Sequence, residues 1–215
     1  MSRNYIFYIS EKNFRNKKIE NYPNIEKHFK QFEKPLREAK IKYGTPTKTY
    51  FFLHREREET FFNNGPKIVC GIRVQYPSFY FTDNEYFGSR ALNFIKTTRI
   101  DLKYLTGIIN SNLSYFWLKN KGKQLGDLLQ IDKRPLLDIP ICVGDKKIQK
   151  IIGLVNKIQL LNEEIKKISE NSDKWHEVKK EIAKTNQEID QNVYELYGLT
   201  AEEIRTVEES LKTEK

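Results

Sequence analysis

The sequence has 215 residues, of which 38% are hydrophobic and 13% are aromatic. A chain of this length and composition can build one sizeable core, with or without an appendage, so we expect it to fold. No window approaches the ~18 apolar residues of a membrane span, and the first residues lack the apolar core of a signal peptide. We therefore expect a soluble, cytoplasmic protein with no membrane partner.

The charge is basic and unevenly distributed. The chain has 38 Lys and Arg against 29 Asp and Glu, a net charge of +9. Residues 1–143 hold 25 basic and 14 acidic residues, a balance of +11, whereas residues 144–215 hold 13 and 15, a balance of −2. A polyanionic partner would therefore contact the first two thirds of the chain. The two cysteines, Cys70 and Cys142, stand in apolar contexts without C-x-x-C spacing, which argues against a disulfide framework or a zinc site.

The first 60 residues are rich in aromatic side chains. Residues 5–9 and 50–53 are aromatic and β-branched runs that predict strands. Residues 24–32 predict a helix that follows Pro23 at its start. After the second run, Arg55 and Arg57 alternate with glutamates. They belong either to a solvated charged turn or to a nucleic-acid face, where guanidinium groups can pair with guanine edges or phosphates.

Short strands separated by turns follow. Residues 67–74 predict a strand with a glycine interruption, and residues 79–81, 86–87 and 93–95 predict further short strands. This spacing indicates a small mixed or antiparallel sheet with packed helices. Exposed basic and aromatic residues of this region are candidates for nucleic-acid contacts, namely Lys67, Arg73, Tyr76 and Arg90.

The central stretch, residues 105–141, organises the rest of the chain. It predicts one amphipathic helix over residues 105–118, then a basic glycine-containing loop over 119–124, a short apolar run and a strand-like end. Lysines are compact charges on flexible stems, which suits them to phosphates. The loop candidates are Lys119, Lys121, Lys123 and Gln124.

The last third differs in kind. Apolar residues recur at spacings of three and four from Ile148 to Leu196, with a polar interruption at residues 171–173, and predict two long antiparallel helices. Gly198 is placed as a C-terminal cap, and Thr200 with Glu203 matches a capping box that starts a short last helix. The fold class is thus α+β, with a first domain over residues 1–145 and a helical hairpin with a short C-terminal helix over 146–215. The hairpin either covers the sheet, docks a partner subunit or forms a homodimer.

Three ordered pieces resemble one protein family. They are L-x-G-I-I-N-S-x-L followed by K-x-K-G-K and P-L-x-x-I-P-I in the central stretch, the strand region from Gly65 to Phe87, and the segment DQNVYELYGLTAEEI near the end. Together they resemble the TaqI-like C-terminal specificity domain of bacterial DNA adenine methyltransferases and type IIG restriction-modification enzymes. The resemblance implies recognition of double-stranded DNA beside a methyltransferase or endonuclease domain or subunit.

Catalytic motifs are absent from the sequence. No N-P-P-Y-like loop or glycine-rich turn would hold a flipped adenine or S-adenosylmethionine, and no phosphate loop occurs. Matches to the E-x-K of metal-dependent nucleases fall in charged stretches that read as solvated faces. We expect a module that is not an enzyme by itself, with S-adenosylmethionine and Mg²⁺ confined to a catalytic domain or partner. The alternatives are an interaction subunit that recruits such a partner through the hairpin, and a free-standing nuclease.

Overall fold

The computed structural model describes residues 7–144 and 147–212 and divides into two compact units, residues 1–60 and 61–215. The first unit contains a 3-10 turn, Ile19–Asn21, and two helices, α1 (Pro23–Lys30) and α2 (Glu33–Lys42). Pro23 occupies the first turn of α1, as predicted. A further 3-10 turn, Glu59–Phe61, lies where the two units divide.

Neither strand predicted in the first unit forms among its described residues. Residues 7–9 are irregular and residues 5–6 lie outside the described residues, whereas residues 50–52 form a turn and a bend and residue 53 is irregular. The Leu53 N–H donates to the Ile9 carbonyl at 3.0 Å, and Lys40 Nζ donates to the Phe52 carbonyl. The aromatic run packs ring against ring, with Phe51 and Phe52 centroids 4.9 Å apart. Isolated hydrogen bonds and ring packing therefore replace the strand ladder that the composition predicted.

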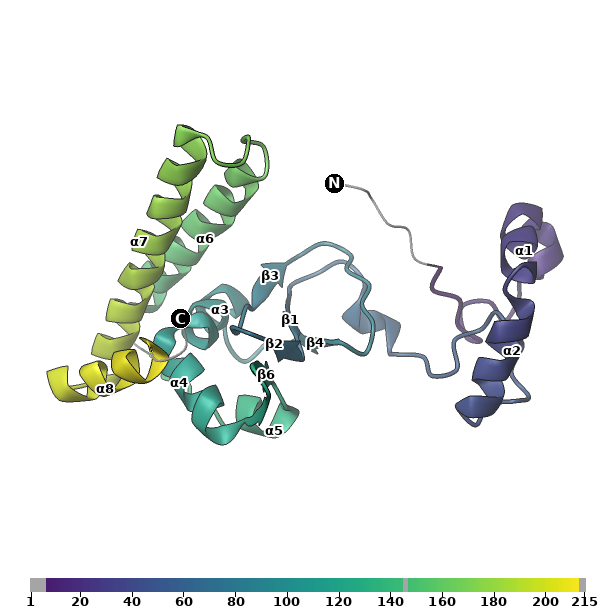
Figure 1. The fold of residues 1–215 in the computed structure, drawn as a ribbon, viewed down its shortest axis with the longest axis horizontal. Coiled ribbons are helices and arrows are strands. Elements are labelled where there is room, and N and C mark those ends of the chain that lie inside the picture. Colours follow the sequence, from purple (N-terminus) through teal and green to yellow (C-terminus); the bar gives the residue numbers. More distant parts are fainter. Residues whose placement is uncertain (1–6, 145–146, 213–215) are drawn as a thin grey trace. The chain divides into compact units, whose positions relative to one another are not determined.

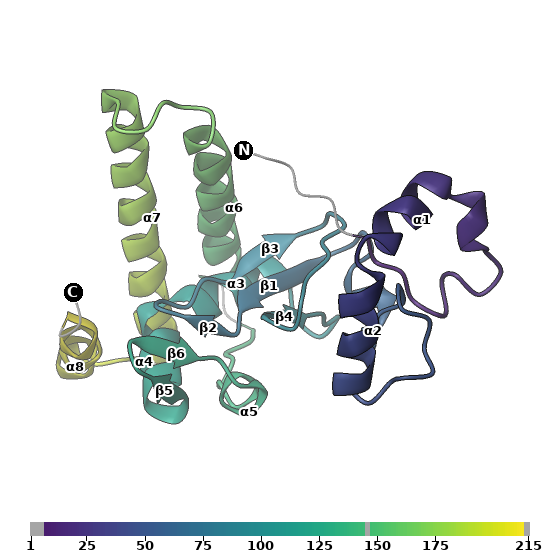
Figure 2. The ribbon, with the colours of Figure 1, turned by 45° about the vertical axis from the view of Figure 1, so that its right-hand side comes forward.

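The second unit contains two small antiparallel sheets, which confirms the α+β class. The first has the order β3-β1-β4 and the second the order β2-β6-β5 (Figure 2). Their strands are β1 (Lys67–Gly71), β2 (Arg73–Val74), β3 (Tyr80–Thr82), β4 (Leu92–Ile95), β5 (Lys123–Leu125) and β6 (Leu128–Gln130). The predicted strand at residues 86–87 is wrong, because Phe87 leaves the sheet to stack on Phe62 at 5.1 Å.

One residue joins the two sheets. Ile72 lies between β1 and β2; its N–H donates to the Ala91 carbonyl at 2.8 Å, and its carbonyl accepts from the Ile131 N–H at 2.7 Å. Its backbone thus bonds to the segment before β4 on one side and the segment after β6 on the other. The predicted glycine interruption at Gly71 is the point where the chain changes sheets.

The predicted central helix is two helices, α3 (Leu102–Asn110) and α4 (Asn112–Lys121). Ser111 separates them with an extended ψ of 155°, and its Oγ accepts from the Ser114 N–H at 3.3 Å as the N-cap of α4. The apolar period runs across this break because α3 and α4 both pack on hydrophobic cores.

The predicted basic loop is also wrong. Helix α4 continues to Lys121 and β5 begins at Lys123, so Gly122 alone connects them. A Cβ at Gly122 would lie 2.4 Å from the Leu118 carbonyl oxygen, and only glycine permits so close a turn. Residues 139–141, predicted as strand-like, are irregular and follow a short helix, α5 (Lys133–Leu137). An i,i+4 pair between Arg134 and Asp138 at 2.8 Å closes that helix.

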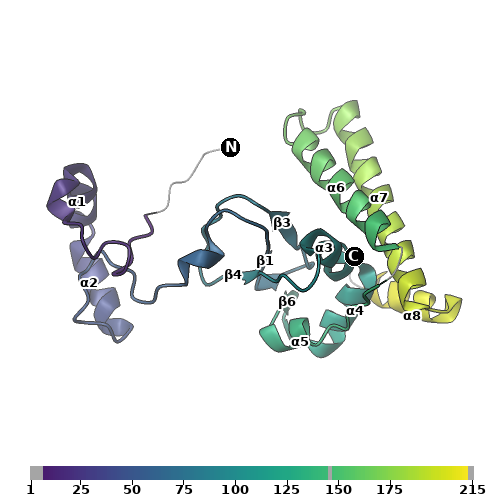
Figure 3. The same cartoon turned by 180° about the vertical axis from the view of Figure 1, so that it is seen from behind.

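The hairpin forms as predicted. Helices α6 (Lys147–Ile165) and α7 (Asp173–Tyr197) lie side by side and antiparallel, and α8 (Ala201–Lys212) turns off at their base (Figures 1 and 3). Gly198 ends α7 with a φ of 67°, and the Thr200 N–H donates to Glu203 Oε2 at 2.8 Å in the capping box. None of the described helices is long and apolar enough to cross a membrane.

The base of the hairpin shares a core with α3. Tyr104 and Ile108 of α3 are buried against α6 and α7, on which Ile151, Val155 and Val193 are buried as well. A second cluster joins both sheets to the other side of α3 and to α4. Because α3 contributes to both cores, the compact unit runs from residue 61 through the hairpin. The division predicted at residue 145 does not coincide with the compact units, which divide at residue 60.

Candidate nucleic-acid interface

The second sheet aligns three polar residues from distant parts of the sequence. Arg73 of β2 and Lys123 of β5 both pair with Gln130 of the central strand β6. Directly paired residues of an antiparallel sheet project to the same face, so the three side chains form one row. The exposed pair Leu125 and Leu128 extends this face. We call these five residues the Arg73 face.

The two sides of the sheet differ sharply. Arg73 and Lys123 are exposed and Gln130 is half-buried, whereas Leu129, in the alternate row, is 2% exposed and belongs to the core. Two strand spacings put the backbones of Arg73 and Lys123 about 10 Å apart. The Arg73 face therefore presents two cations that flank a polar amide.

A tight turn and a polar hollow lie at the β5–β6 end of this sheet. Residues Gly126 and Asp127 form the two-residue turn between β5 and β6, with a left-handed φ of 60° at Gly126. The hollow has a volume of about 410 Å³ and is lined by Gln75, Tyr76, Gln124, Gly126 and Asp127. Tyr76 and Gln124, both predicted as site residues, thus share one depression, and the Tyr76 side chain is 50% exposed.

Arg90 lies beside Arg73 on the other flank. The Ala91 carbonyl accepts a hydrogen bond from the Ile72 N–H. Arg90 precedes Ala91 and Arg73 follows Ile72, so the two arginines are neighbours of this hydrogen-bonded pair on two antiparallel segments. Arg90 is exposed in the turn that precedes β4. The predicted Arg73 and Arg90 therefore occupy adjacent backbone segments although 17 positions separate them.

Lys67 differs from the other predicted residues because its side chain is fully buried. Its Nζ donates to the carbonyls of Asn63 at 2.7 Å and Gly65 at 3.1 Å, and burial lowers its pKa. An ammonium group held in this way has no surface to offer a phosphate, so Lys67 does not belong to the interface. Its position at the start of a buried strand was the sequence signal for this role.

The three lysines predicted in one loop occupy different surroundings. Lys119 Nζ donates to the Ser210 carbonyl near the end of α8 at 2.7 Å. Lys121 is exposed, with its ammonium 5.7 Å from the centre of the Trp117 ring. Only Lys123 lies on the Arg73 face, because the predicted loop is the end of a helix and the start of a strand.

The arginines predicted near residue 55 belong to the first compact unit. Arg55 is exposed and Arg57 is half-buried. The Tyr8 hydroxyl donates to the Arg57 carbonyl and accepts from the Arg57 N–H, each at 2.9 Å. These contacts fix the Arg57 backbone within its own unit, so the two arginines are not assigned to the Arg73 face.

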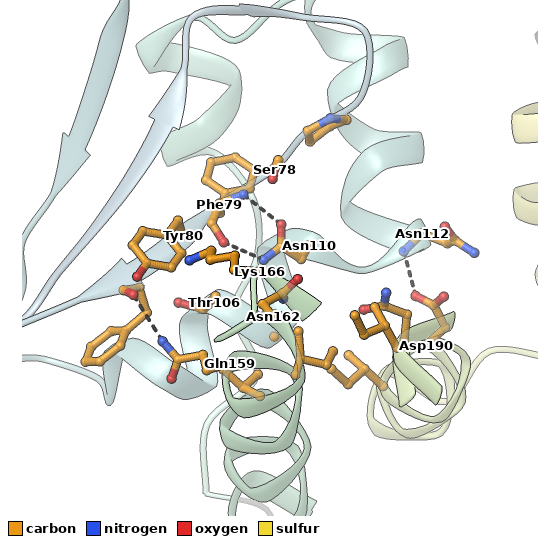
Figure 4. A pocket seen from close by; sticks show the side chains of 18 residues that line it. Ser78, Phe79, Tyr80, Thr106, Asn110, Asn112, Gln159, Asn162, Lys166 and Asp190 are labelled. Atoms are coloured by element: carbon orange, nitrogen blue, oxygen red, sulfur yellow. Dashed lines mark hydrogen bonds between the residues drawn. The ribbon is translucent and has the colours of Figure 1, made fainter. Parts of the chain in front are cut away.

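A second depression, of about 580 Å³, lies between β3, α3 and the hairpin (Figure 4). Its polar side chains bind the elements together. Asn110 Nδ2 donates to the Phe79 carbonyl and its Oδ1 accepts from the Phe79 N–H, both at 2.8 Å. Asp190 of α7 accepts from the Asn112 N–H at 2.7 Å, and burial raises the pKa of Asp190 to about 6. The I-N-S motif therefore has a structural role, because hydrogen bonds at and beside it connect α3 and α4 with the segment before β3 and with α7.

The described residues contain no cluster of three His, Cys, Asp or Glu that could hold a metal ion. Burial raises the pKa of the Cys70 thiol to about 11, so this thiol stays protonated and unreactive.

The Arg73 face, with its two cations and the amide of Gln130, is suited to bind an anionic polymer.

The fold and this exposed basic face define a recognition domain, and comparison with known proteins gives its family. The chain belongs to the TaqI-like C-terminal specificity domain family, whose model matches residues 1–141. This match includes both sheets, α3 and α4, and it confirms the expected family. No curated protein matches the chain.

A solved structure shares the fold. The type IIL restriction-modification enzyme MmeI, determined in complex with DNA, aligns with a TM-score of 0.59 at 14% sequence identity. The alignment covers 91% of this chain and 28% of that enzyme. The chain thus corresponds in length to a minor part of a much larger protein.

Proposed function

We propose that this chain is the DNA target-recognition module of a restriction-modification system and is not catalytic by itself. The observation that carries the proposal is the row of Arg73, Gln130 and Lys123. The sheet register brings these residues, up to 57 positions apart, onto one exposed face. This face lies within the residues that match the specificity-domain family.

The turn of the β5–β6 hairpin, at the end of the three-stranded sheet, would enter a groove of duplex DNA. A major groove roughly 12 Å wide admits a two-stranded ribbon. In this arrangement Lys123 and Arg73 each contact a phosphate, Lys123 as a compact charge and Arg73 through its guanidinium fork. Asp127 at the ribbon tip would repel a phosphate but can accept from the exocyclic amine of cytosine. The tip therefore faces base edges, with the cations beside the backbone.

The catalytic steps belong to another domain or subunit in this proposal. The family is defined as a C-terminal specificity domain, and the chain spans 28% of the length of the similar enzyme. S-adenosylmethionine and Mg²⁺ would bind to that catalytic part. Activity of the purified chain alone on DNA, with both cofactors supplied, would contradict this division.

A second candidate function is docking through the outer half of the hairpin. Leu160 of α6 is 73% exposed there and is an apolar residue on an otherwise polar face. A catalytic subunit or a second copy of the chain would cover this leucine. Changing Leu160 to Asp should then disrupt assembly, measured by sedimentation, without changing the affinity for DNA.

Fluorescence anisotropy with a labelled mixed-sequence duplex tests the proposal. Wild type should bind with an affinity that falls as salt rises, and Arg73→Ala and Lys123→Ala should each bind more weakly. The matched controls are Arg205→Ala and Lys180→Ala, which remove exposed cations from α8 and α7. The proposal is wrong if the wild type does not bind, or if all four variants bind like wild type.

A further inference from the structure

Gln130 is the central residue of the Arg73 face, with a cation on each side. The sequence alone does not single it out, because its neighbours in the row are paired with it only through the sheet register. Its side chain is half-buried, whereas the arginine and lysine beside it are exposed. A base-reading residue needs this restraint, because a loosely held amide loses entropy on binding.

Asp132 restrains the Gln130 amide. Gln130 Nε2 donates to Asp132 Oδ1 at 2.7 Å. Asp132 stands at the N-cap of α5, yet its side chain makes no capping hydrogen bond there. The carboxylate is thus used for Gln130 rather than for the helix. The opposite amide orientation would bring two oxygen acceptors together, so Asp132 also determines which end of the amide carries the nitrogen.

The remaining edge of this amide has a defined hydrogen-bonding pattern. Nε2 carries two N–H groups, one on the same side as Oε1 and one on the opposite side. When the opposite-side N–H is the one donated to Asp132, Oε1 and the second N–H lie side by side on the free edge of the amide. This acceptor and donor pair matches N6 and N7 of adenine in the major groove, to which glutamine can bind in bidentate fashion. Guanine presents two acceptors at the equivalent edge and would leave Oε1 without a donor.

We propose that Gln130, oriented by Asp132, reads an adenine in the recognised DNA sequence. The inference rests on the proposed function and names the residue and the base. Arg73 and Lys123 hold the duplex on either side, and Gln130 supplies discrimination at the base pair between them. Asp132 is a positioning residue, since it acts through Gln130.

Selection of bound duplexes from a randomised pool by the full chain tests this inference. Wild type should show a preference for adenine at one position, and Gln130→Ala should reduce that preference roughly 5- to 150-fold. Its non-specific affinity and salt dependence should stay unchanged. The matched control is Gln187→Ala, which removes an exposed glutamine from α7 and should keep the full preference.

Two further arms separate positioning from folding. Asp132→Asn keeps an oxygen acceptor for Nε2 and should retain most of the preference. Asp132→Ala should lose it while binding the pool as tightly as Asp132→Asn, which lacks the same negative charge. Replacing the selected adenine by 7-deazaadenine should weaken wild type and leave Gln130→Ala unaffected. A wild-type preference that survives in Gln130→Ala overturns this inference and spares the proposed function. Equal binding of all sequences by wild type overturns the inference and sequence-specific recognition, and absence of binding overturns the proposed function itself.

Discussion

Asn110 binds both backbone polar groups of Phe79, donating to its carbonyl and accepting from its N–H at 2.8 Å each (Figure 4). Phe79 precedes β3, which is an edge strand of its sheet. Gln159 of α6 donates to the Phe81 carbonyl on the same strand at 3.1 Å. Side chains thus occupy backbone groups that another strand could otherwise pair with, and they tie the sheet to α3 and the hairpin.

Removal of the Asn110 amide should destabilise the domain. Asn110→Ala leaves the Phe79 N–H without its partner, which costs about 1–3 kcal/mol in the free energy of unfolding. Urea denaturation followed by tryptophan fluorescence measures this change. Asn162→Ala, an exposed asparagine in the same depression, is the control. Equal stability of the two variants would show that the Asn110 bonds contribute nothing.

Asp190 should make stability depend on pH. Its folded-state pKa of about 6 lies above its ordinary value of 3.8, because burial disfavours the carboxylate. As pH rises from 4, the carboxyl ionises first in the unfolded state, so the folded state loses stability until pH passes 6. The total is of order 3 kcal/mol.

The Asp190→Asn variant isolates this effect, because an amide oxygen can still accept from the Asn112 N–H. Its stability advantage over wild type should be smallest near pH 4 and should grow up to pH 7. Urea denaturation of both proteins across this range supplies the measurement. An advantage that is constant or shrinks with rising pH would contradict a destabilisation of the Asp190 carboxylate by burial.

Two glycines test the packing of the hairpin on α3. A Cβ at Gly107 would lie 2.5 Å from Ile151 Cγ2 and 3.2 Å from Val155 Cγ2, whereas a Cβ at Gly153 meets nothing within 4 Å. Gly107→Ala should therefore destabilise by about 1–3 kcal/mol through overpacking, despite a gain in helix propensity. Gly153→Ala, within α6, should stabilise by about 0.5–1 kcal/mol. Melting temperatures that move in the same direction would argue that α6 does not press on α3.

The lysines at 119 and 123 should separate stability from DNA binding. Lys119→Ala removes the hydrogen bond to Ser210 and should lower the melting temperature while leaving the salt slope of log K unchanged. Lys123→Ala should leave the melting temperature unchanged and reduce the salt slope by about one unit. Calorimetry and salt titrations check both. The reverse assignment would return Lys119 to the interface.

Local signals in the sequence predicted local structure well. Pro23, Gly198 and the Thr200–Glu203 capping box act within one helical turn, and each lies where it was expected. The long hairpin was predictable because its apolar period persists over many turns. The helix boundary at Ser111 was missed. Ser111 is the N-cap of α4, but the apolar period of α3 continues past it into α4.

Non-local relationships could not be predicted from the sequence. Arg73 is 57 positions from Gln130, and only the register of β2 on β6 pairs them, whereas Lys123 faces Gln130 across the short β5–β6 hairpin. Lys67 and Lys119 are the residue type that binds phosphates, but their ammonium groups donate to backbone carbonyls of the folded chain. The DNA contacts of the basic residues stay a prediction, and their division into structural and exposed groups required the fold.

The contact surface itself gives the most direct test. Backbone amide chemical shifts of the full chain, recorded by NMR during addition of a mixed-sequence duplex, map the residues that approach DNA. The largest changes should fall on residues 73–76 and 123–130, which carry the Arg73 face and the adjoining hollow. Changes concentrated on the hairpin tip around residues 165–173, with the second sheet unaffected, would contradict recognition through this sheet.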